Sequence, residues 1–324
     1  MSARVIEEVE EVEEVEEVMT IVLGTRGSRL ALAQTELAKQ AIERLPEKPE
    51  VVVEIIKTTG DQRLDIRLRQ PGPKIDQGLF TKELEEALLR REIDLAVHSL
   101  KDLPTALPTG LELAATLPRH DPGDVLISKS AKSLGEVPWN AIVATGSLRR
   151  ARQILLVRPD LRIVDIRGNV PTRIAKLVQE SSWNAIVLAK AGLERLGYIL
   201  DEGRIEALRL FVSNLVELLP AVGQGAIGLQ VRSDDTQLKE LLVHVNDAET
   251  WFCIQAEREL LSMLGGGCHL PLGVRTRIDG AEFSMEAILF RDQISPVRVF
   301  VSGVFTEPRE VATALLHRIY GQGK

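Results

Sequence analysis

The sequence predicts an α/β protein with open sheets, followed by a smaller α+β domain towards the C-terminal end. Over the first two-thirds of the 324 residues, short β-branched runs alternate with amphipathic helical periods. Such alternation builds open sheets whose ligands bind at the carboxyl ends of the strands. From Val274 the pattern changes to strands at 283–290 and 297–304, closed by a helix at 308–320. A chain of this length has room for two or three domains, each with a buried core.

The first predicted strand, residues 20–23, leads into the turn Gly24-Thr25-Arg26-Gly27-Ser28 and then into a helix. Apolar side chains at helical spacing give this helix one buried face, made of Leu30, Ala33, Leu37 and Ala41. Ser28 stands where an N-cap is expected, because its hydroxyl can accept a hydrogen bond from a free N–H of the first turn. Residues 51–57 form the next predicted strand.

The alternation continues through the middle of the chain. A helical period at 80–88 leads into a strand at 94–98, and after Pro108 the pattern restarts. The later elements are strands at 141–145, 161–166 and 185–189, with helices from Ser147 and at 172–178. Beyond them lie a glycine-containing, strand-like run at 219–232 and a helix with Phe252, Ala256, Leu260 and Met263 on one face. That helix ends at Gly265-Gly266-Gly267.

The net charge of −7 comes from the N-terminal tail. Residues 1–18 hold eight Glu and one Arg, so the rest of the chain is neutral. Bulk charge therefore points to no partner, and any charge signal has to be local. The tail repeats E-E-V, a low-complexity pattern in which Glu repulsion favours a solvated or fraying helix. We expect no catalytic role for it.

Composition and residue usage indicate a cytoplasmic protein. The chain is 27% charged and 44% apolar, as soluble proteins are. No apolar run is long enough to cross a bilayer, and the N-terminus lacks the features of a secretory signal or transit peptide. Two cysteines, Cys253 and Cys268, cannot make a disulfide framework. The five His residues show no metal-ligand spacing, so no metal is expected.

Arginine is concentrated in one short stretch. Residues 145–173 contain seven Arg against two Asp, namely Arg149, Arg150, Arg152, Arg158, Arg162, Arg167 and Arg173. Planar, permanently charged guanidiniums suit a cleft that binds carboxylates. A solvated basic face or a nucleic-acid patch are the alternatives. Only 4% of the residues are aromatic and no stacking motif accompanies the cluster, which weakens the nucleic-acid interpretation.

Three further features could carry chemistry. The strand-to-helix turns at 24–28 and 145–147 could offer N–H groups and hydroxyls to a carboxylate, although their Ser residues could equally act as caps. Asp102 follows the strand at 94–98, where an Asp is more often a cap or an ion-pair partner of Lys101. Cys268 follows three glycines that could expose a nucleophilic thiolate; the alternative is an inert thiol, as we expect for Cys253.

Eight segments in this order resemble the motifs of the porphobilinogen deaminase (hydroxymethylbilane synthase) family. They are GTRGS (24–28), GLFTKELE (78–85), AVHSLKDLP (96–104), GSLRR (146–150), RGNV (167–170), LERLG (193–197), LPAVGQGA (219–226) and GGGC (265–268). Each alone is a modest signal, whereas eight in the family's order, covering nearly all of residues 20–275, are very specific.

The resemblance implies two periplasmic-binding-protein-like α/β domains with a cleft between them, plus a smaller α+β C-terminal domain. The acidic tail occupies 1–18, and the first domain 19–117 together with 226–243. The second domain occupies 118–225 and the third 244–324. The return of the chain to the first domain after Gly225 is implied by the resemblance alone.

The implied activity is that of a transferase in tetrapyrrole biosynthesis. Such an enzyme joins four porphobilinogens head to tail into hydroxymethylbilane and releases ammonia. Its primer is a dipyrromethane cofactor, which a thioether joins to the family's cysteine; that cysteine matches Cys268. Porphobilinogen is then the small-molecule partner of a monomer that binds neither nucleic acid nor a membrane.

The resemblance assigns roles residue by residue. Asp102 becomes the catalytic carboxylate, which would hydrogen-bond the leaving ammonium, stabilise an azafulvene cation and move protons. Cofactor-binding positions match Ser28, Ser99, Lys101, Asp102, Thr145, Ser147, Arg149, Arg150, Arg167 and Gly168. Substrate-binding positions match Arg26, Ser28, Arg167, Arg173, Arg195 and Gln224. His98 is interpreted as a strand residue, and Arg152, Arg158 and Arg162 as surface residues.

At three positions the chain departs from the family's pattern. Gln77 stands where Lys is frequent, Gly146 where Ser is common, and Lys190 where apolar residues are usual. Two other classes of protein share parts of the pattern. A periplasmic anion receptor is disfavoured by the segment ending in Cys268, and a transcription-factor effector domain by the lack of a DNA-reading helix.

Overall fold

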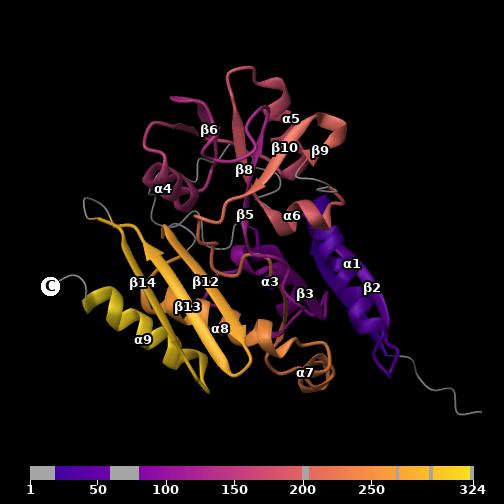
Figure 1. The fold of residues 1–324 in the computed structure, drawn as a ribbon. Coiled ribbons are helices and arrows are strands. Elements are labelled where there is room, and N and C mark those ends of the chain that lie inside the picture. Colours follow the sequence, from indigo (N-terminus) through magenta and orange to yellow (C-terminus); the bar gives the residue numbers. More distant parts are fainter. Residues whose placement is uncertain (1–18, 59–79, 199–203, 268–269, 292–294, 322–324) are drawn as a thin grey trace, which may run out of the picture.

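The structure of the protein is a computed structural model, which describes residues 19–58, 80–198, 204–267, 270–291 and 295–321. Within these ranges Figure 1 shows three sheets, each accompanied by its own helices. The tail at 1–18 lies outside the described residues, as do Gln77 and Cys268.

The first sheet has the strand order β2-β1-β3-β11-β4. Its members are β1 (Thr20–Arg26), β2 (Glu50–Ile56), β3 (Leu95–Ser99), β4 (Leu111–Thr116) and β11 (Ile227–Arg232). β1 pairs in parallel with β2 and β3, while β11 runs antiparallel between β3 and β4. All six residues of β11 are buried, as expected of a central strand covered on both faces. A segment far along the chain therefore completes the first sheet.

Helices cover both faces of this sheet. They are α1 (Arg29–Glu43), α3 (Lys82–Leu89) and α7 (Thr236–Val243). α1 and α7 pack into one apolar core with the strands. α3 packs into a second core, which includes Ala96 of β3 and Leu111 of β4. The predicted cap of α1 is confirmed, because the Ala31 N–H donates to Ser28 Oγ at 3.2 Å.

The second sheet has the order β7-β6-β8-β5-β10-β9. Its strands are β5 (Asp124–Ser128), β6 (Ile142–Ala144), β7 (Arg162–Val164), β8 (Ala185–Ala189), β9 (Arg204–Ile205) and β10 (Leu210–Asn214). β6 is parallel to β7 and β8, and β5 runs antiparallel to β8 and β10. The carboxyl ends of β6, β7 and β8 therefore meet at one edge.

Three helices follow those parallel strands. They are α4 (Leu148–Val157), α5 (Val170–Gln179) and α6 (Lys190–Arg195). Ser147 Oγ accepts from the Arg150 N–H at 3.4 Å, which confirms the helix start expected there. Two separate apolar clusters fill the two faces of the sheet.

The third sheet is the antiparallel meander β12 (Leu272–Asp279), β13 (Glu282–Leu289) and β14 (Val297–Gly303). Helices α8 (Ala248–Met263) and α9 (Pro308–Gly321) cover one of its faces, as Figure 1 shows. The predicted fold class, two α/β units plus a smaller α+β unit, is confirmed. In the part of the chain that the structure describes, no helix is both long enough and apolar enough to cross a lipid bilayer.

Most predicted elements are present, and several others were missed. β4, β5, β9, β10 and β12 were not expected as strands, and α6 and α7 were not expected as helices. β5 is buried at every position, β4 is buried or half-buried without a regular period, and β12 begins with three buried residues in a row. A strand of this kind lacks the period-two alternation that marks a half-exposed one.

The chain crosses between the first and second sheets twice, at 118–123 and at 221–226. The two crossings are hydrogen-bonded, with the His120 N–H donating to the Gly225 carbonyl at 3.2 Å. Gly225 has a φ of +85°, and a Cβ there would lie 2.5 Å from the His120 oxygen. Only glycine fits such a close approach in this backbone region. The crossings therefore form one compact, two-stranded connection.

Candidate active site

The motif residues gather at the carboxyl ends of parallel strands in both α/β sheets. In the first sheet Gly24 pairs with Ala96, so the segments that leave β1 and β3 emerge side by side. In the second sheet the segments after β6, β7 and β8 do the same. The two groups are close, because a Cβ on Gly192 of α6 would lie 3.8 Å from Leu30 of α1.

Asp102 ends a 3₁₀ turn, Leu100–Asp102, directly after β3. The Leu103 N–H closes this turn by donating to the Leu100 carbonyl at 3.3 Å. Leu100 is buried whereas Asp102 is exposed. Gly223 of the second crossing packs against this turn so tightly that a Cβ there would lie 2.8 Å from the Leu100 carbonyl carbon. The carboxylate thus stands at the surface on a turn anchored in the core.

Charges from both sheets act on one another around Asp102. Burial is the main cause of the lowered pKa of Lys101; Asp102 opposes it, and Arg150 adds to it. Burial also lowers the pKa of Arg173 to about 10. Arg150 and Arg167 lower the Arg173 pKa further, whereas Asp102 raises it. Asp102 of the first sheet and the arginines of the second therefore belong to one electrostatic site.

Arg167 has a donor to spare in this site. Its Nε donates to Asp165 Oδ2 at 3.0 Å, whereas its Nη2 is buried without a hydrogen-bond partner among the described residues. Arg173 Nε donates to the Gly168 carbonyl at 2.7 Å, and Gly168 has a φ of +111°. A buried guanidinium donor without an acceptor is rare in folded proteins. It suits an incoming carboxylate.

Arg149 and Arg150, which the resemblance assigns to cofactor binding, share a buried carboxylate partner within the fold. Both are 6% exposed, and both pair with Asp124 at the start of β5. Arg149 Nη1 lies 2.8 Å from Asp124 Oδ2, and Arg150 Nη2 donates to Asp124 Oδ1 at 2.7 Å. Their positive charge is therefore partly neutralised by a buried carboxylate of the protein itself. Asp124 lies in no motif, so nothing in the sequence pointed to this partner.

Asp124→Asn is expected to destabilise the protein by about 3–5 kcal/mol at neutral pH, because it leaves two buried guanidiniums without their counter-charge. Burial alone would raise the pKa of Asp124, but the charges and hydrogen bonds of Arg149 and Arg150 hold it well below its usual range. The ionised carboxylate therefore stabilises the fold above the unfolded-state pKa of about 3.9. That contribution is lost as the pH falls through the lower folded-state value.

Urea unfolding of wild type and variant from pH 7 downwards measures this effect. The gap between them should be constant above about pH 4 and shrink below it. Asp234→Asn serves as the control, since Asp234 is exposed and pairs with Arg91 at the surface; it should cost less than about 1 kcal/mol. An equal, small effect of both substitutions would contradict the prediction.

Gln224 and Arg195 hold the crossings. The Gln224 side chain is 1% exposed and donates to the Pro122 carbonyl at 2.6 Å and to Asp124 Oδ1 at 2.8 Å. Its amide N–H groups are thus used inside the protein. Arg195 Nη2 donates to the Gly225 carbonyl at 2.7 Å, while its Nε is buried without a partner among the described residues. Burial lowers the pKa of Arg195 to about 10.

The remaining polar candidates make local contacts at the strand ends. The Arg26 guanidinium lies 4.2 Å from the centroid of the Phe80 ring. Ser99 Oγ donates to Gln34 Oε1 at 2.9 Å. Thr145 is fully buried, and its Oγ1 accepts from the Ser147 N–H at 3.2 Å. The capping expected at the turns 24–28 and 145–147 is made by Ser28 and Ser147.

The two cysteines differ in what the structure says of them. Cys268 lies outside the described residues, just beyond Gly267. Cys253 is buried in α8, and burial raises its thiol pKa to about 11. A thiol with so little thiolate at neutral pH is a poor nucleophile, which agrees with the inert role predicted for Cys253.

The departures from the family's pattern are accommodated where the structure describes them. A Cβ at Gly146 would lie 2.9 Å from the Ile166 carbonyl oxygen, so the turn after β6 is tighter than a Ser would allow without a shift. Lys190 Nζ pairs with Asp121 Oδ2 at 2.8 Å at the first crossing. Lys190 therefore ties α6 to the connection between the sheets.

Sequence reasoning interpreted His98 as a strand residue, and its surroundings agree. His98 is buried, and its Nε2 lies 2.8 Å from Gln230 Oε1 of β11. Burial is the main cause that lowers its pKa to about 4, so the ring is neutral near pH 7. Of the arginines expected at the surface, Arg152 and Arg162 are exposed. Arg158 is half-buried and bonded to Asp160 and the Leu134 carbonyl.

The site suits a ligand that carries several carboxylates. Arg167 and Arg195 each keep a buried donor without a hydrogen-bond partner among the described residues, and the charges of Arg167 and Asp102 both act on Arg173. A dipyrromethane bearing acetate and propionate groups has the complementary charge.

Among the described residues, no group of three or more His, Cys, Asp and Glu is arranged to hold a metal ion.

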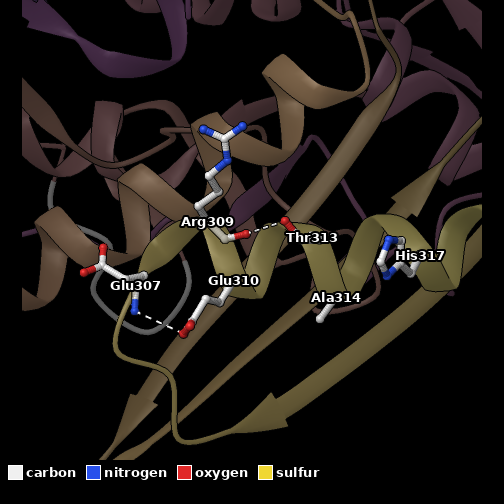
Figure 2. A pocket seen from close by; sticks show the side chains of 6 residues that line it. All are labelled: Glu307, Arg309, Glu310, Thr313, Ala314 and His317. Carbon is white, nitrogen blue, oxygen red and sulfur yellow. Dashed lines mark hydrogen bonds between the residues drawn. The ribbon is translucent and has the colours of Figure 1, made fainter.

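A hollow of about 590 Å³ lies elsewhere, on the outer side of α9. Figure 2 shows its lining, in which the Glu307 N–H donates to Glu310 Oε2 at 3.4 Å and Thr313 Oγ1 donates to the Arg309 carbonyl at 2.8 Å. These are the ordinary contacts of the first turns of a helix. None of the lining residues belongs to the motifs, so we assign the hollow no part in the site.

Comparisons with known proteins agree with this geometry. Residues 21–240 match the family model described as porphobilinogen deaminase, dipyromethane cofactor binding domain, and residues 251–319 match its C-terminal domain. The porphobilinogen deaminase of Desulforudis audaxviator is 45% identical over 93% of this chain and 94% of its own length. That of Roseiflexus sp. is 42% identical over 93% and 96%.

Among solved structures, the substrate-binding domain 2 of Lactococcus lactis GlnP has a TM-score of 0.42 and 11% identity, covering 78% of this chain and 92% of that one. A likeness this low says nothing about activity. The family models, by contrast, span almost all of the described chain, and the two relatives each match 93% of the chain. The chain belongs to the porphobilinogen deaminase family.

Proposed function

We propose that this chain condenses porphobilinogen stepwise into hydroxymethylbilane, with release of ammonia, on a dipyrromethane primer joined through a thioether to Cys268. One observation carries the chemistry: an exposed carboxylate, Asp102, shares an electrostatic site with Lys101 and the arginines of the facing sheet. Family membership supports the identity of the substrate and of the cofactor.

The cations of the site hold carboxylates in this proposal. Cofactor contacts go to Ser28, Ser99, Lys101, Asp102, Thr145, Ser147, Arg149, Arg150, Arg167 and Gly168. Substrate contacts go to Arg26, Ser28, Arg167, Arg173, Arg195 and Gln224. Because Arg149, Arg150 and Gln224 already bond to Asp124, they act chiefly by shaping the site. The free donors of Arg167 and Arg195 are the direct ligands.

Asp102 carries the proton chemistry. When bound, the dipyrromethane supplies a pyrrole α-carbon as the nucleophile from which chain growth starts. The Asp102 carboxylate accepts a hydrogen bond from the aminomethyl ammonium of porphobilinogen before ammonia leaves. It then stabilises the cation that remains and accepts a proton when aromaticity is restored. Its exposed position on a rigid turn suits each of these roles.

The division of the chain and its setting complete the proposal. We assign 19–117 with 226–243 to the first domain, 118–225 to the second and 244–324 to the third, with the tail at 1–18 outside all three. The protein acts as a monomer, as the resemblance to the family implies. It acts in the cytoplasm, where a reducing medium keeps the Cys268 thiol available for the thioether.

Porphobilinogen consumption by the purified protein tests the function. The substrate should disappear, ammonia should be released, and a linear tetrapyrrole should accumulate. An aldehyde reagent for pyrroles should also colour the protein itself, since the primer stays bound. A well-folded preparation that bears the cofactor yet leaves porphobilinogen untouched would overturn the proposal.

Arg173→Lys tests the carboxylate-binding role. Lysine keeps the positive charge but loses the planar fork and the bond to the Gly168 carbonyl, so kcat/KM should fall. A lost charge-assisted hydrogen bond costs about 1.5–3 kcal/mol, or roughly 10- to 150-fold. Arg162→Lys is the matched control, because Arg162 is exposed and lies in no motif. Equal kcat/KM for both variants would remove Arg173 from the site.

A further inference from the structure

One face of helix α8 supports the turn that carries Asp102. Ile254 of α8 is fully buried and belongs to the same small apolar cluster as Leu100 and Leu103, which flank Asp102. Residues four apart on a helix share a face. The next residue on this face is Arg258, which is 7% exposed. The turn that carries Asp102 therefore packs against Ile254 of α8, and the buried Arg258 guanidinium lies one helical turn further along α8.

Arg258 donates to three successive main-chain carbonyls just after Asp102. Its Nη1 donates to the Leu103 oxygen at 3.1 Å, and its Nη2 to the Pro104 oxygen at 2.8 Å and the Thr105 oxygen at 3.3 Å. Burial lowers the Arg258 pKa to about 10, so the group stays charged near pH 7. A planar fork that engages three carbonyls at once defines the path of that backbone segment.

The neighbouring residue anchors α8 itself. Glu257 is fully buried and binds the guanidinium of Arg119 in the first crossing, with 2.7 Å between Oε1 and Nη1. Its Oε2 accepts from the Gly223 N–H of the second crossing at 2.8 Å. Thr276 Oγ1 of β12 donates to Oε1 at 2.7 Å. At the level of Arg258, α8 is thus held to both crossings and to its own sheet.

Apolar packing holds only the first residue of the segment after Asp102. Leu103 is buried in the cluster with Ile254, whereas Pro104 and Thr105 are half-buried. Beyond them a surface hollow of about 340 Å³ lies between α8 and β4, and Thr105 and Arg258 are among the residues that line it. The main chain at 104–105 therefore depends on the Arg258 hydrogen bonds more than on side-chain packing.

We propose that Arg258 is a positioning residue for the reaction of Asp102: by holding the main chain at 103–105 it sets where the Asp102 carboxylate points. This inference rests on the proposed function. It assigns to the C-terminal unit, through α8, a part in orienting the carboxylate of the first sheet. Arg258 touches neither substrate nor cofactor in this role, and it acts only through the turn.

Arg258→Lys tests the proposal. Lysine retains the charge but cannot reach three carbonyls at once, so the turn loses its orientation. Misplacement by about 1 Å can cost roughly 100-fold, and we expect kcat to fall about 10- to 100-fold with KM unchanged. Arg258→Gln, which removes the buried charge, is the second variant should the lysine variant fold poorly, and it should show the same split. Each kcat is calculated per molecule of folded, cofactor-loaded protein. Intact mass measures the cofactor content, and circular dichroism measures the folded fraction.

Arg232→Lys is the matched control. Arg232 is 6% exposed, against 7% for Arg258, and it donates to the Leu88 and Ile93 carbonyls at the far end of β11 from the Asp102 turn. Unlike Arg258, it also pairs with the carboxylates of Asp94 and Asp235. It should lower stability and leave kcat per folded molecule unchanged. A fall in kcat equal to that of Arg258→Lys would overturn the proposal, since any buried arginine would then act alike.

A double-mutant cycle with Asp102→Asn separates positioning from general damage. If Arg258 acts through Asp102, adding Arg258→Lys to Asp102→Asn should lower the residual rate by less than twofold. A further 10- to 100-fold loss in that background, or a normal kcat for Arg258→Lys alone, would overturn the proposal. If wild type with bound cofactor consumes no porphobilinogen, the proposed function itself is what fails.

Discussion

Asp102→Asn should lower single-turnover porphobilinogen consumption by about 10²–10⁴-fold, the range that general acid–base catalysis supplies. The amide keeps the shape of the side chain but removes both the negative charge that stabilises the cation and the proton acceptor. Loss of cation stabilisation adds to the effect. The fold should be unaffected, because Asp102 is exposed and its turn is anchored through buried Leu100.

The measurement compares folded, cofactor-loaded variants. Asp102→Glu should retain more activity than Asp102→Asn, although its longer side chain misplaces the carboxylate. Near-normal turnover by Asp102→Asn would remove this carboxylate from the mechanism. The search would then move to Glu83, at the start of α3, and to Asp65, which lies outside the described residues.

Cys268→Ser should abolish attachment of the cofactor and, with it, turnover. A hydroxyl is a far weaker nucleophile than a thiolate, so no thioether can form. Intact-mass spectrometry of wild type should show an increment of two porphobilinogens less two ammonias, and the variant should lack it. Cys253→Ser is the control, because a buried thiol with a raised pKa of about 11 does not capture an electrophile at neutral pH. An unmodified wild-type mass in an active preparation would refute the attachment.

The catalytic candidates could be predicted from sequence because their signals are local. A motif places Asp102 immediately after a strand, and three glycines precede Cys268. Ser28 and Ser147 cap helices through bonds to N–H groups three residues away, within the reach of a sequence pattern. Such patterns do not show which partner a side chain binds within the fold. Nothing in the sequence indicates that Arg149 and Arg150 pair with Asp124.

The sequence by itself determined the α/β class, the C-terminal α+β unit and the starts of the helices capped by Ser28 and Ser147. Strand and helix periods repeat every two or 3.6 residues, so a few neighbouring side chains suffice to reveal them. The tertiary structure alone decided that β11 inserts between β3 and β4, and that Glu257 joins both crossings. It also decided that Arg258 holds the turn after Asp102. The hydrogen bonds that Glu257 makes with the crossings and Arg258 with the turn join residues 34 to 155 positions apart. Their partners are set by how whole sheets pack and not by any spacing along the chain.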